Sequence, residues 1–212
     1  MEKPSEFFVG VLDLFAILLP GAVATALLKK AAESWDFASL VALPAGEAAE
    51  WATFLLVAYA LGHLIFQVGS LLEDQYEKLR NPWDAGDDRN PYRAAEALRD
   101  GLLTEGERKA IKTFQWARST LLIQCPAAAQ DVHRLEADSK FFRSLFVVGV
   151  IATLFLLSPE HAAGGLVTAL LSGLCFYLYR KRRAKSIKQA CIHVIALHRA
   201  GGGKERTPTG ET

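Results

Sequence analysis

Residues 162–179 read AAGGLVTALLSGLCFYLY and contain no charged side chain. A helix needs about 20 mainly apolar residues to cross the hydrocarbon core of a bilayer. A helix in the core of a soluble protein usually carries a polar face, and this stretch has none. The stretch therefore predicts a membrane-spanning helix, and this prediction decides the class of fold for the whole chain.

Three further apolar stretches match or nearly match this length, and they occupy residues 7–28, 51–72 and 141–157. Residues 158–161, Ser-Pro-Glu-His, leave room only for a tight hairpin between the last two stretches. The chain is 51% hydrophobic and 22% charged, and the two kinds of residue are segregated along it, which is typical of membrane proteins. We predict an all-α, polytopic membrane protein with four transmembrane helices.

Lysine and arginine side chains predict the orientation of these spans, because they accumulate on the cytoplasmic side of a membrane. They are dense in residues 73–140 and directly after residue 179, sparse in residues 29–50, and absent from residues 158–161. We therefore expect both termini and residues 73–140 to lie in the cytoplasm of a cell whose inner (plasma) membrane the chain crosses. Ala22-Val23-Ala24 resembles a signal-peptide cleavage site, but Asp13 interrupts the apolar run and favours a retained span.

The predicted order of regions follows from these spans. It comprises a first transmembrane pair with its outer loop (1–72), a cytoplasmic helical domain (73–140), a second transmembrane hairpin (141–179), a cytoplasmic helix (180–200) and a disordered tail (201–212). The long inter-span segment and the extensions of the spanning helices should together form a cytoplasmic helical bundle. Such a bundle is too small to be stable without support from the spans or from other subunits.

Short residue motifs predict where the helices of the cytoplasmic part begin and end. The second span should continue as a helix to Arg80 and end at Asn81-Pro82. Asn90-Pro91 predicts the start of a short helix, and the capping box Thr104–Glu107 predicts a second one that Cys125-Pro126 breaks. We further predict one helix from about residue 127 to 157, and a last helix that continues from the fourth span to about His198.

Polar side chains within the spans are candidates for function, because ionisable groups are costly in lipid. The chain places Asp13 in the first span, His63 and Gln67 in the second, and Arg143 at the start of the third. These four residues can form an intramembrane polar cluster. One interpretation is an ion pair that fixes helix packing, and the other is a proton- or ion-responsive site or pore lining.

Two further motifs concern how the helices pack. Pro20-Gly21 should kink or unwind the first span. Gly165, Ala169 and Gly173 recur every four residues, and small residues at this spacing permit two helices to approach closely. The partner of this stripe can be the third span or another subunit. After the fourth span, Arg180, Lys181, Arg182 and Arg183 should lie at anionic lipid headgroups.

The sequence contains no nucleotide-binding, hydrolase or metalloprotease motif, so we predict no catalytic residue, no cofactor and no metal site. The three cysteines are far apart and odd in number, which argues against a disulfide framework. The formal net charge is only +1, and acidic and basic residues are nearly balanced in residues 73–140, so no nucleic acid is expected as a partner.

Two short runs carry a resemblance to known proteins. The run DLFAILLPG at residues 13–21 and the run EADSKFFRSL at residues 136–145 resemble segments of uncharacterised prokaryotic multi-pass membrane proteins. Some proteins of this layout accompany antiphage or CRISPR systems. The resemblance implies a membrane effector or sensor in antiviral defence, and it implies no catalytic residue.

These features lead to one main hypothesis and two alternatives. The main hypothesis is a non-enzymatic, homo-oligomeric membrane protein that couples a cytoplasmic signal or partner to its spans, which would act as a pore or channel. The first alternative is a passive membrane anchor for a soluble cytoplasmic protein, bound through residues 73–125. The second is a lipid-acting intramembrane enzyme with Asp13 and His63 as the reactive pair. In each case membrane lipids surround the spans.

Overall fold

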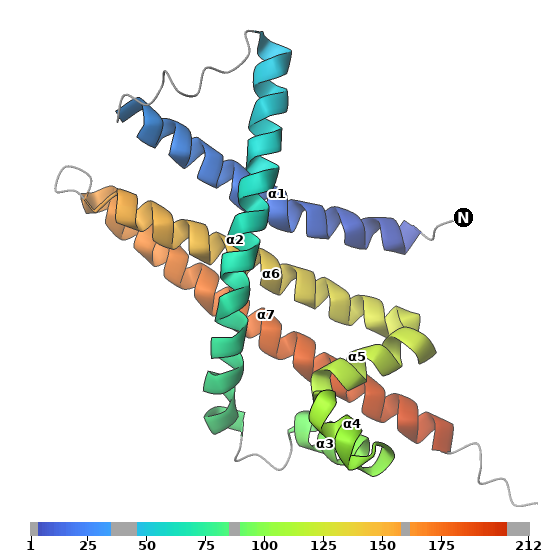
Figure 1. The fold of residues 1–212 in the computed structure, drawn as a ribbon. Helices are drawn as coiled ribbons and strands as arrows, with labels where there is room; N and C mark the ends of the chain where they lie inside the picture. The colour runs from blue at the N-terminus through green and yellow to red at the C-terminus, as the bar shows by residue number, and fades with distance from the viewer. Residues whose placement is uncertain (1–3, 35–45, 85–89, 158–161, 203–212) are drawn as a thin grey trace, which may run out of the picture. The chain divides into compact units, whose positions relative to one another are not determined.

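The computed structural model of the chain is helical throughout the part that it describes, which is residues 4–34, 46–84, 90–157 and 162–202 (Figure 1). Side chains are described at residues 14–32, 46–71, 73, 90–157 and 162–200. The helices in these ranges are α1 (Pro4–Ser34), α2 (Glu47–Asp84), α3 (Pro91–Leu102), α4 (Glu105–Ala110), α5 (Thr113–Gln124), α6 (Pro126–Phe155) and α7 (Ala162–Gly202). The described residues contain no strand, and the all-α prediction is confirmed.

Three of these helices are long and apolar enough to cross a membrane. The qualifying segments are Leu14–Ala32 in α1, Glu47–Leu71 in α2 and Ala162–Ala200 in α7. Only about a fifth of each segment is buried within the chain. Large apolar side chains therefore remain exposed along the spans, as they are where a helix faces lipid rather than water. A membrane protein with transmembrane helices is the class of protein that this arrangement supports.

Helix α6 does not meet the same criterion, although residues 141–157 were predicted as the third span. Its apolar stretch follows Lys140, contains Arg143 near its start, and the helix ends at Phe155. These bounds leave it shorter than the usual crossing length of about 20 residues. Three spans are thus supported by length and composition, and the fourth stays a prediction.

The chain divides into two compact units. The first unit comprises Met1–Arg80 and Glu136–Arg182, and the second comprises Asn81–Leu135 and Arg183–Thr212. Both divisions in the later half of the chain fall inside a helix, because Leu135–Glu136 lies within α6 and Arg182–Arg183 lies within α7. Each of these two helices therefore supplies residues to both units.

The first unit has its apolar core where three helices meet. Ile65 of α2 packs with Val147 and Val148 of α6, and Ala24 and Leu27 of α1 lie against them. Within this unit, α6 and α7 form an antiparallel hairpin (Figure 1). The two helices approach closely, because a Cβ atom added at Gly149 would lie 2.9 Å from the Cβ of Ser172.

The second unit is built from short helices and the ends of long ones. Its buried apolar side chains are those of Ala95, Ala117, Leu121, Ala129, Val132, Ile187, Ala190, Cys191 and Val194. Asn90 caps α3, since its side chain accepts a hydrogen bond from the Tyr92 amide at 3.0 Å, and Pro91 opens the helix as predicted. The long helix predicted from residue 127 is confirmed as α6, and the last helix, predicted to about His198, is α7, which ends at Gly202.

Two helix boundaries differ from the predictions. Helix α2 continues through Asn81-Pro82 to Asp84, because a proline ring holds φ at a helical value and Pro82 removes only one hydrogen bond near the helix end. The helix predicted from Thr104 is two helices, α4 and α5, separated at Ile111–Lys112.

The break between α4 and α5 lies beside a buried arginine of α3. The buried Arg99 guanidinium donates to the Ile111 carbonyl at 3.3 Å and to the Thr113 hydroxyl at 2.9 Å. It also donates two hydrogen bonds, at 2.7 and 2.9 Å, to the Asp100 carboxylate. Arg99 thus contacts both sides of the break, and the next helix starts at Thr113.

Candidate functional site

The most deeply buried charge in the first unit is Arg143 on α6, whose side chain is 3% exposed. Its Nη1 donates to a carboxylate oxygen of Glu73 on α2 at 2.9 Å. Glu73 is 34% exposed and lies just beyond the apolar segment that ends at Leu71. A buried charge without a partner destabilises a fold. The ion pair with Glu73 therefore stabilises the packing of α2 against α6.

The surroundings of Arg143 are fitted to its side chain. The guanidinium carbon lies 4.9 Å from the centroid of the Phe66 ring, within the range of a cation–π interaction. A Cβ atom at Gly69 would lie 3.2 Å from the Nε of Arg143, so only glycine leaves ordinary van der Waals space at this position. Phe66, Gly69 and Glu73 recur at helical spacing, and they place one face of α2 against the arginine.

Among the described side chains, no hydrogen bond or ion pair joins members of the predicted intramembrane cluster, and Arg143 pairs with a residue that was not predicted. Arg143 binds Glu73, and among the described residues no hydrogen bond or ion pair joins it to His63 or Gln67. His63 packs against the edge of Tyr59, with ring centroids 4.5 Å apart and an interplanar angle of 84°. The side chain of Gln67 is exposed. Asp13 belongs to α1, but its side chain lies outside the described residues.

Further polar side chains are buried on α6, the helix that carries Arg143. On α6, Glu136, Ser139 and Ser144 are all buried, and the Ser139 hydroxyl donates to the Glu136 carbonyl at 2.8 Å. The Nζ of Lys140 lies 3.5 Å from the Glu136 carboxylate, four residues away on the same helix. The amino-terminal half of α6 within the first unit is thus polar and buried, whereas the half toward Phe155 is apolar.

Pro20 and Gly21 lie where α1 and α2 cross. A Cβ atom at Gly21 would overlap the carbonyl of Ala58, and one at Gly62 would overlap the carbonyl of Ile17. The two backbones are therefore in direct contact through a glycine on each helix. Pro20 is fully buried, and α1 is one helix through it. The motif predicted to kink or unwind the span thus lies in a continuous helix at a close crossing.

The small residues of the predicted stripe on α7 have different surroundings within the chain. A Cβ atom at Gly165 would lie 2.9 Å from the Leu156 carbonyl oxygen, so this glycine lets the end of the hairpin close. Gly173 is exposed and has nothing within 4 Å of its Cβ position. The close contact between α6 and α7 is made instead by Gly149 and Ser172, whose hydroxyl donates to the Phe146 carbonyl at 3.2 Å.

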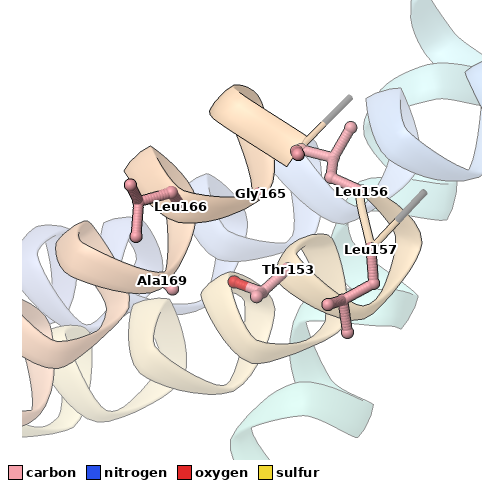
Figure 2. Close-up of a pocket in the computed structure, with 7 residues that line it drawn as sticks. Thr153, Leu156, Leu157, Gly165, Leu166 and Ala169 are labelled. Atoms are coloured by element: carbon pink, nitrogen blue, oxygen red, sulfur yellow. The ribbon is translucent and has the colours of Figure 1, made fainter. Parts of the chain in front are cut away.

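Figure 2 shows a pocket of about 480 Å³ at the end of the hairpin, with Leu156 and Leu157 on one side and Leu166 and Ala169 on the other. Thr153 supplies the one polar side chain among the lining residues, and its hydroxyl donates to the Gly149 carbonyl at 2.7 Å. The described lining of the pocket is therefore apolar apart from the Thr153 hydroxyl.

The four basic residues after the fourth predicted span divide into two pairs. Arg182 lies 3.6 Å from the Asp138 carboxylate, and the buried Arg183 guanidinium lies 4.9 Å from the Phe114 ring centroid. Arg180 and Lys181 are exposed, and the Nζ of Lys181 lies 5.9 Å from the ring centroid of Tyr177. Arg180, Lys181 and the 41% exposed side chain of Arg182 thus keep access to solvent or headgroups, whereas Arg183 is buried.

Among the described residues, no group of three or more His, Cys, Asp and Glu side chains is arranged to hold a metal ion. Cys125, Cys175 and Cys191 form no disulfide bond in the described part of the chain.

The site residue that sequence reasoning missed is Glu73. It was assigned to the cytoplasmic segment because it follows an apolar run. An available signal was that the second and third predicted spans are antiparallel neighbours, which places the end of one, at Glu73, beside the start of the other, at Arg143.

Comparison of the chain with protein-family models, with curated proteins and with solved structures found no match in any of the three.

Proposed function

We propose that this protein is a four-pass, homo-oligomeric inner-membrane protein that couples a cytoplasmic signal or partner to its spans, which respond by opening a pore. The observation that carries the proposal is the continuity of α6 and α7. Each helix runs without a break from residues of the second unit into residues of the first. A continuous helix can transmit a shift or rotation from one end to the other, as helices do in many switching proteins.

The fourth crossing is proposed on physical grounds. The apolar half of α6 packs along the apolar half of α7, through Gly149 against Ser172 and through the Phe146 and Phe176 rings, whose centroids are 5.1 Å apart. If α7 lies in the bilayer over residues 162–179, its neighbour must share the same environment. Leu154 on α6 is 64% exposed, which favours a lipid-facing side chain.

The orientation rests on charge. Basic residues concentrate in residues 73–140 and after residue 179, so we propose that the second unit and both termini are cytoplasmic. The resemblance to membrane proteins of prokaryotic defence favours antiviral defence as the setting. The Glu73–Arg143 pair would then lie near the cytoplasmic face and hold α2 to the helix that carries the signal.

Ion flux tests the pore directly. The full chain is reconstituted into liposomes loaded with a potassium-sensitive dye, with and without cytosolic extract of the source cells. The proposal predicts flux above that of empty liposomes in at least one condition. Because the pore is proposed to open on a cytoplasmic event, extract should raise the flux when added to the side of the second unit. Flux that never exceeds the empty-liposome value in either condition would refute the pore.

One observation favours the anchor function as a second candidate. At the end of α5 in the second unit, Leu122 is 56% exposed and Ile123 is 81% exposed. Large apolar side chains exposed side by side on a non-spanning helix are typical of protein-binding surfaces. If the protein is only an anchor, Ile123→Ser should abolish its activity in cells while Asp13→Asn leaves that activity intact. The pore function predicts that the Asp13 substitution also changes activity if that carboxylate lines the pore.

A further inference from the structure

The exposed pair Arg180 and Lys181 differs from its neighbours in having no acidic partner within ion-pair distance among the described residues. Arg182 has Asp138, and Arg183 is buried against Phe114. Two positive charges therefore remain together on the surface of α7, directly after its apolar stretch. Exposed cations that directly follow an apolar stretch are well placed to bind anionic headgroups at a membrane surface.

Lys181 is placed over an aromatic ring. Tyr177 lies one helical turn before it and is 57% exposed, and the Lys181 ammonium lies 5.9 Å from the Tyr177 ring centroid. Tyrosine is enriched where the hydrocarbon core meets the headgroup region, because its ring is apolar and its hydroxyl is polar. The Lys181 stem can lie along this ring while the ammonium stays at the polar surface.

The same side of α7 is apolar before Tyr177. Leu174 is 51% exposed and Leu170 is 67% exposed, and the four residues Leu170, Leu174, Tyr177 and Lys181 recur at spacings of three and four. They therefore form one exposed stripe along the helix. At 1.5 Å per residue the stripe is about 16 Å long, close to the thickness of one leaflet of a hydrocarbon core about 30 Å across.

We propose that this stripe is a binding site for one anionic phospholipid. The phosphate binds Lys181 with Arg180 beside it, the ester region lies at Tyr177, and an acyl chain lies along Leu174 and Leu170. The order of side chains from apolar to amphipathic to cationic is the order of groups along a phospholipid. Two cations favour an anionic headgroup over a zwitterionic one, because a zwitterionic lipid supplies no net negative charge.

A second copy of the chain fits the stripe less well. In a two-fold dimer the same surface meets itself, so lysine and arginine side chains of the two copies would lie near one another. The assignment of the lipid to the cytoplasmic leaflet rests on the proposed topology. Binding of the lipid itself rests only on the exposed stripe.

Native mass spectrometry of the full chain in detergent, with phosphatidylglycerol and phosphatidylcholine added in equal amounts, tests the site. The unmodified protein should retain phosphatidylglycerol preferentially as one tightly bound molecule per subunit. The double variant Arg180→Gln/Lys181→Gln should lose this preference, by about five-fold for each charge removed. Lys181→Arg should keep it.

The matched control is Lys29→Gln/Lys30→Gln, which removes two exposed charges at the end of another span. It should leave phosphatidylglycerol retention unchanged. The proposal is overturned if the Arg180/Lys181 variant retains the lipid as the unmodified protein does, or if the control loses it equally. It is also overturned if the Arg180/Lys181 variant changes only the number of subunits per particle. Lipid retention does not depend on conduction, so absent flux with intact retention counts against the pore and not against this site.

Discussion

Arg99 in the second unit and Arg143 in the first are both almost completely buried, yet their charges are compensated in different ways. Arg99 donates to groups within 14 residues of itself, which include the Asp100 carboxylate and the Thr113 hydroxyl. Arg143 reaches a carboxylate that is 70 residues away in the sequence and on another helix. The first arrangement fixes a local turn, and the second fixes the packing of two long helices.

This difference extends to the units around the two arginines. The first unit is held by contacts between helices that are distant in sequence, such as the glycine crossing of α1 and α2. In the second unit, caps and local hydrogen bonds define α3, α4 and α5. Substitutions in the first unit should therefore separate helices, whereas those in the second should loosen one turn.

The largest effect should come from leaving Arg143 without its carboxylate. Glu73→Gln should lower the free energy of unfolding by about 3–5 kcal/mol, because the arginine stays buried and loses its counter-charge. Thermal unfolding of the full chain in nanodiscs measures this loss. The matched control is Glu50→Gln, at an exposed glutamate of the same helix, which should change stability little. The double variant Glu73→Gln/Arg143→Met should recover most of the loss. Equal effects of Glu73→Gln and Glu50→Gln would contradict the role of the ion pair.

The next effect concerns the crossing of α1 and α2. Gly21→Ala and Gly62→Ala each place a Cβ atom on a backbone carbonyl of the other helix, so the two helices must separate. We expect a cost of about 1–3 kcal/mol for each, read from the same unfolding measurement. Gly173→Ala, at a glycine with open space, should be neutral or slightly stabilising. If all three substitutions behave alike, the helices do not cross at these glycines.

A local effect is expected at Arg99. Arg99→Met should cost about 1–2 kcal/mol, since it leaves the fully buried Thr113 hydroxyl without its donor. Hydrogen exchange should increase around residues 99–113 and stay unchanged in α1 and α2. Faster exchange in the spans as well would show that the second unit is not held locally.

The smallest expected effect is the loosening of the start of α4 at low pH. The Glu107 carboxylate accepts hydrogen bonds from the Thr104 amide at 2.8 Å and from the Thr104 hydroxyl at 2.7 Å, and these bonds lower its pKa. A carboxyl group whose pKa is lowered on folding stabilises the fold above its unfolded pKa and loses this contribution as the pH falls through the folded pKa. The Thr104 amide should therefore exchange faster as the pH falls below about 4, after correction for intrinsic rates.

Two substitutions in the first turn of α4 test whether Glu107 causes this pH effect. Glu107→Gln should abolish the pH dependence of the corrected exchange. Glu105→Gln should leave it intact, because Glu105 pairs with Lys109 on the exposed surface and does not contact the cap. A pH dependence that survives Glu107→Gln would assign it to another group.

The sequence predicts well those features that depend on neighbours along the chain. The caps at Asn90 and Thr104 and the length of α6 and α7 follow from local residue types, since no proline lies in α6 after Pro126 or anywhere in α7. The break at Ile111–Lys112 was not predicted, although Lys112 and Gln115 form a local cap there, and the contact of Arg99 with this break depends on how α3 packs. The pairing of Glu73 with Arg143 likewise depends on how two helices pack, which periodicity alone does not determine.

The most direct test of the account is the side of the membrane on which each end of α6 and α7 lies. Single cysteines are introduced by Ala48→Cys, Lys109→Cys, Ala162→Cys and Lys188→Cys in a background carrying Cys125→Ala, Cys175→Ala and Cys191→Ala, and intact cells are treated with an impermeant maleimide. The four-pass topology predicts labelling at 48 and 162, and protection at 109 and 188 until the membrane is opened. Protection at 162 together with labelling at 188 would show that α6 does not cross the membrane and would contradict the account.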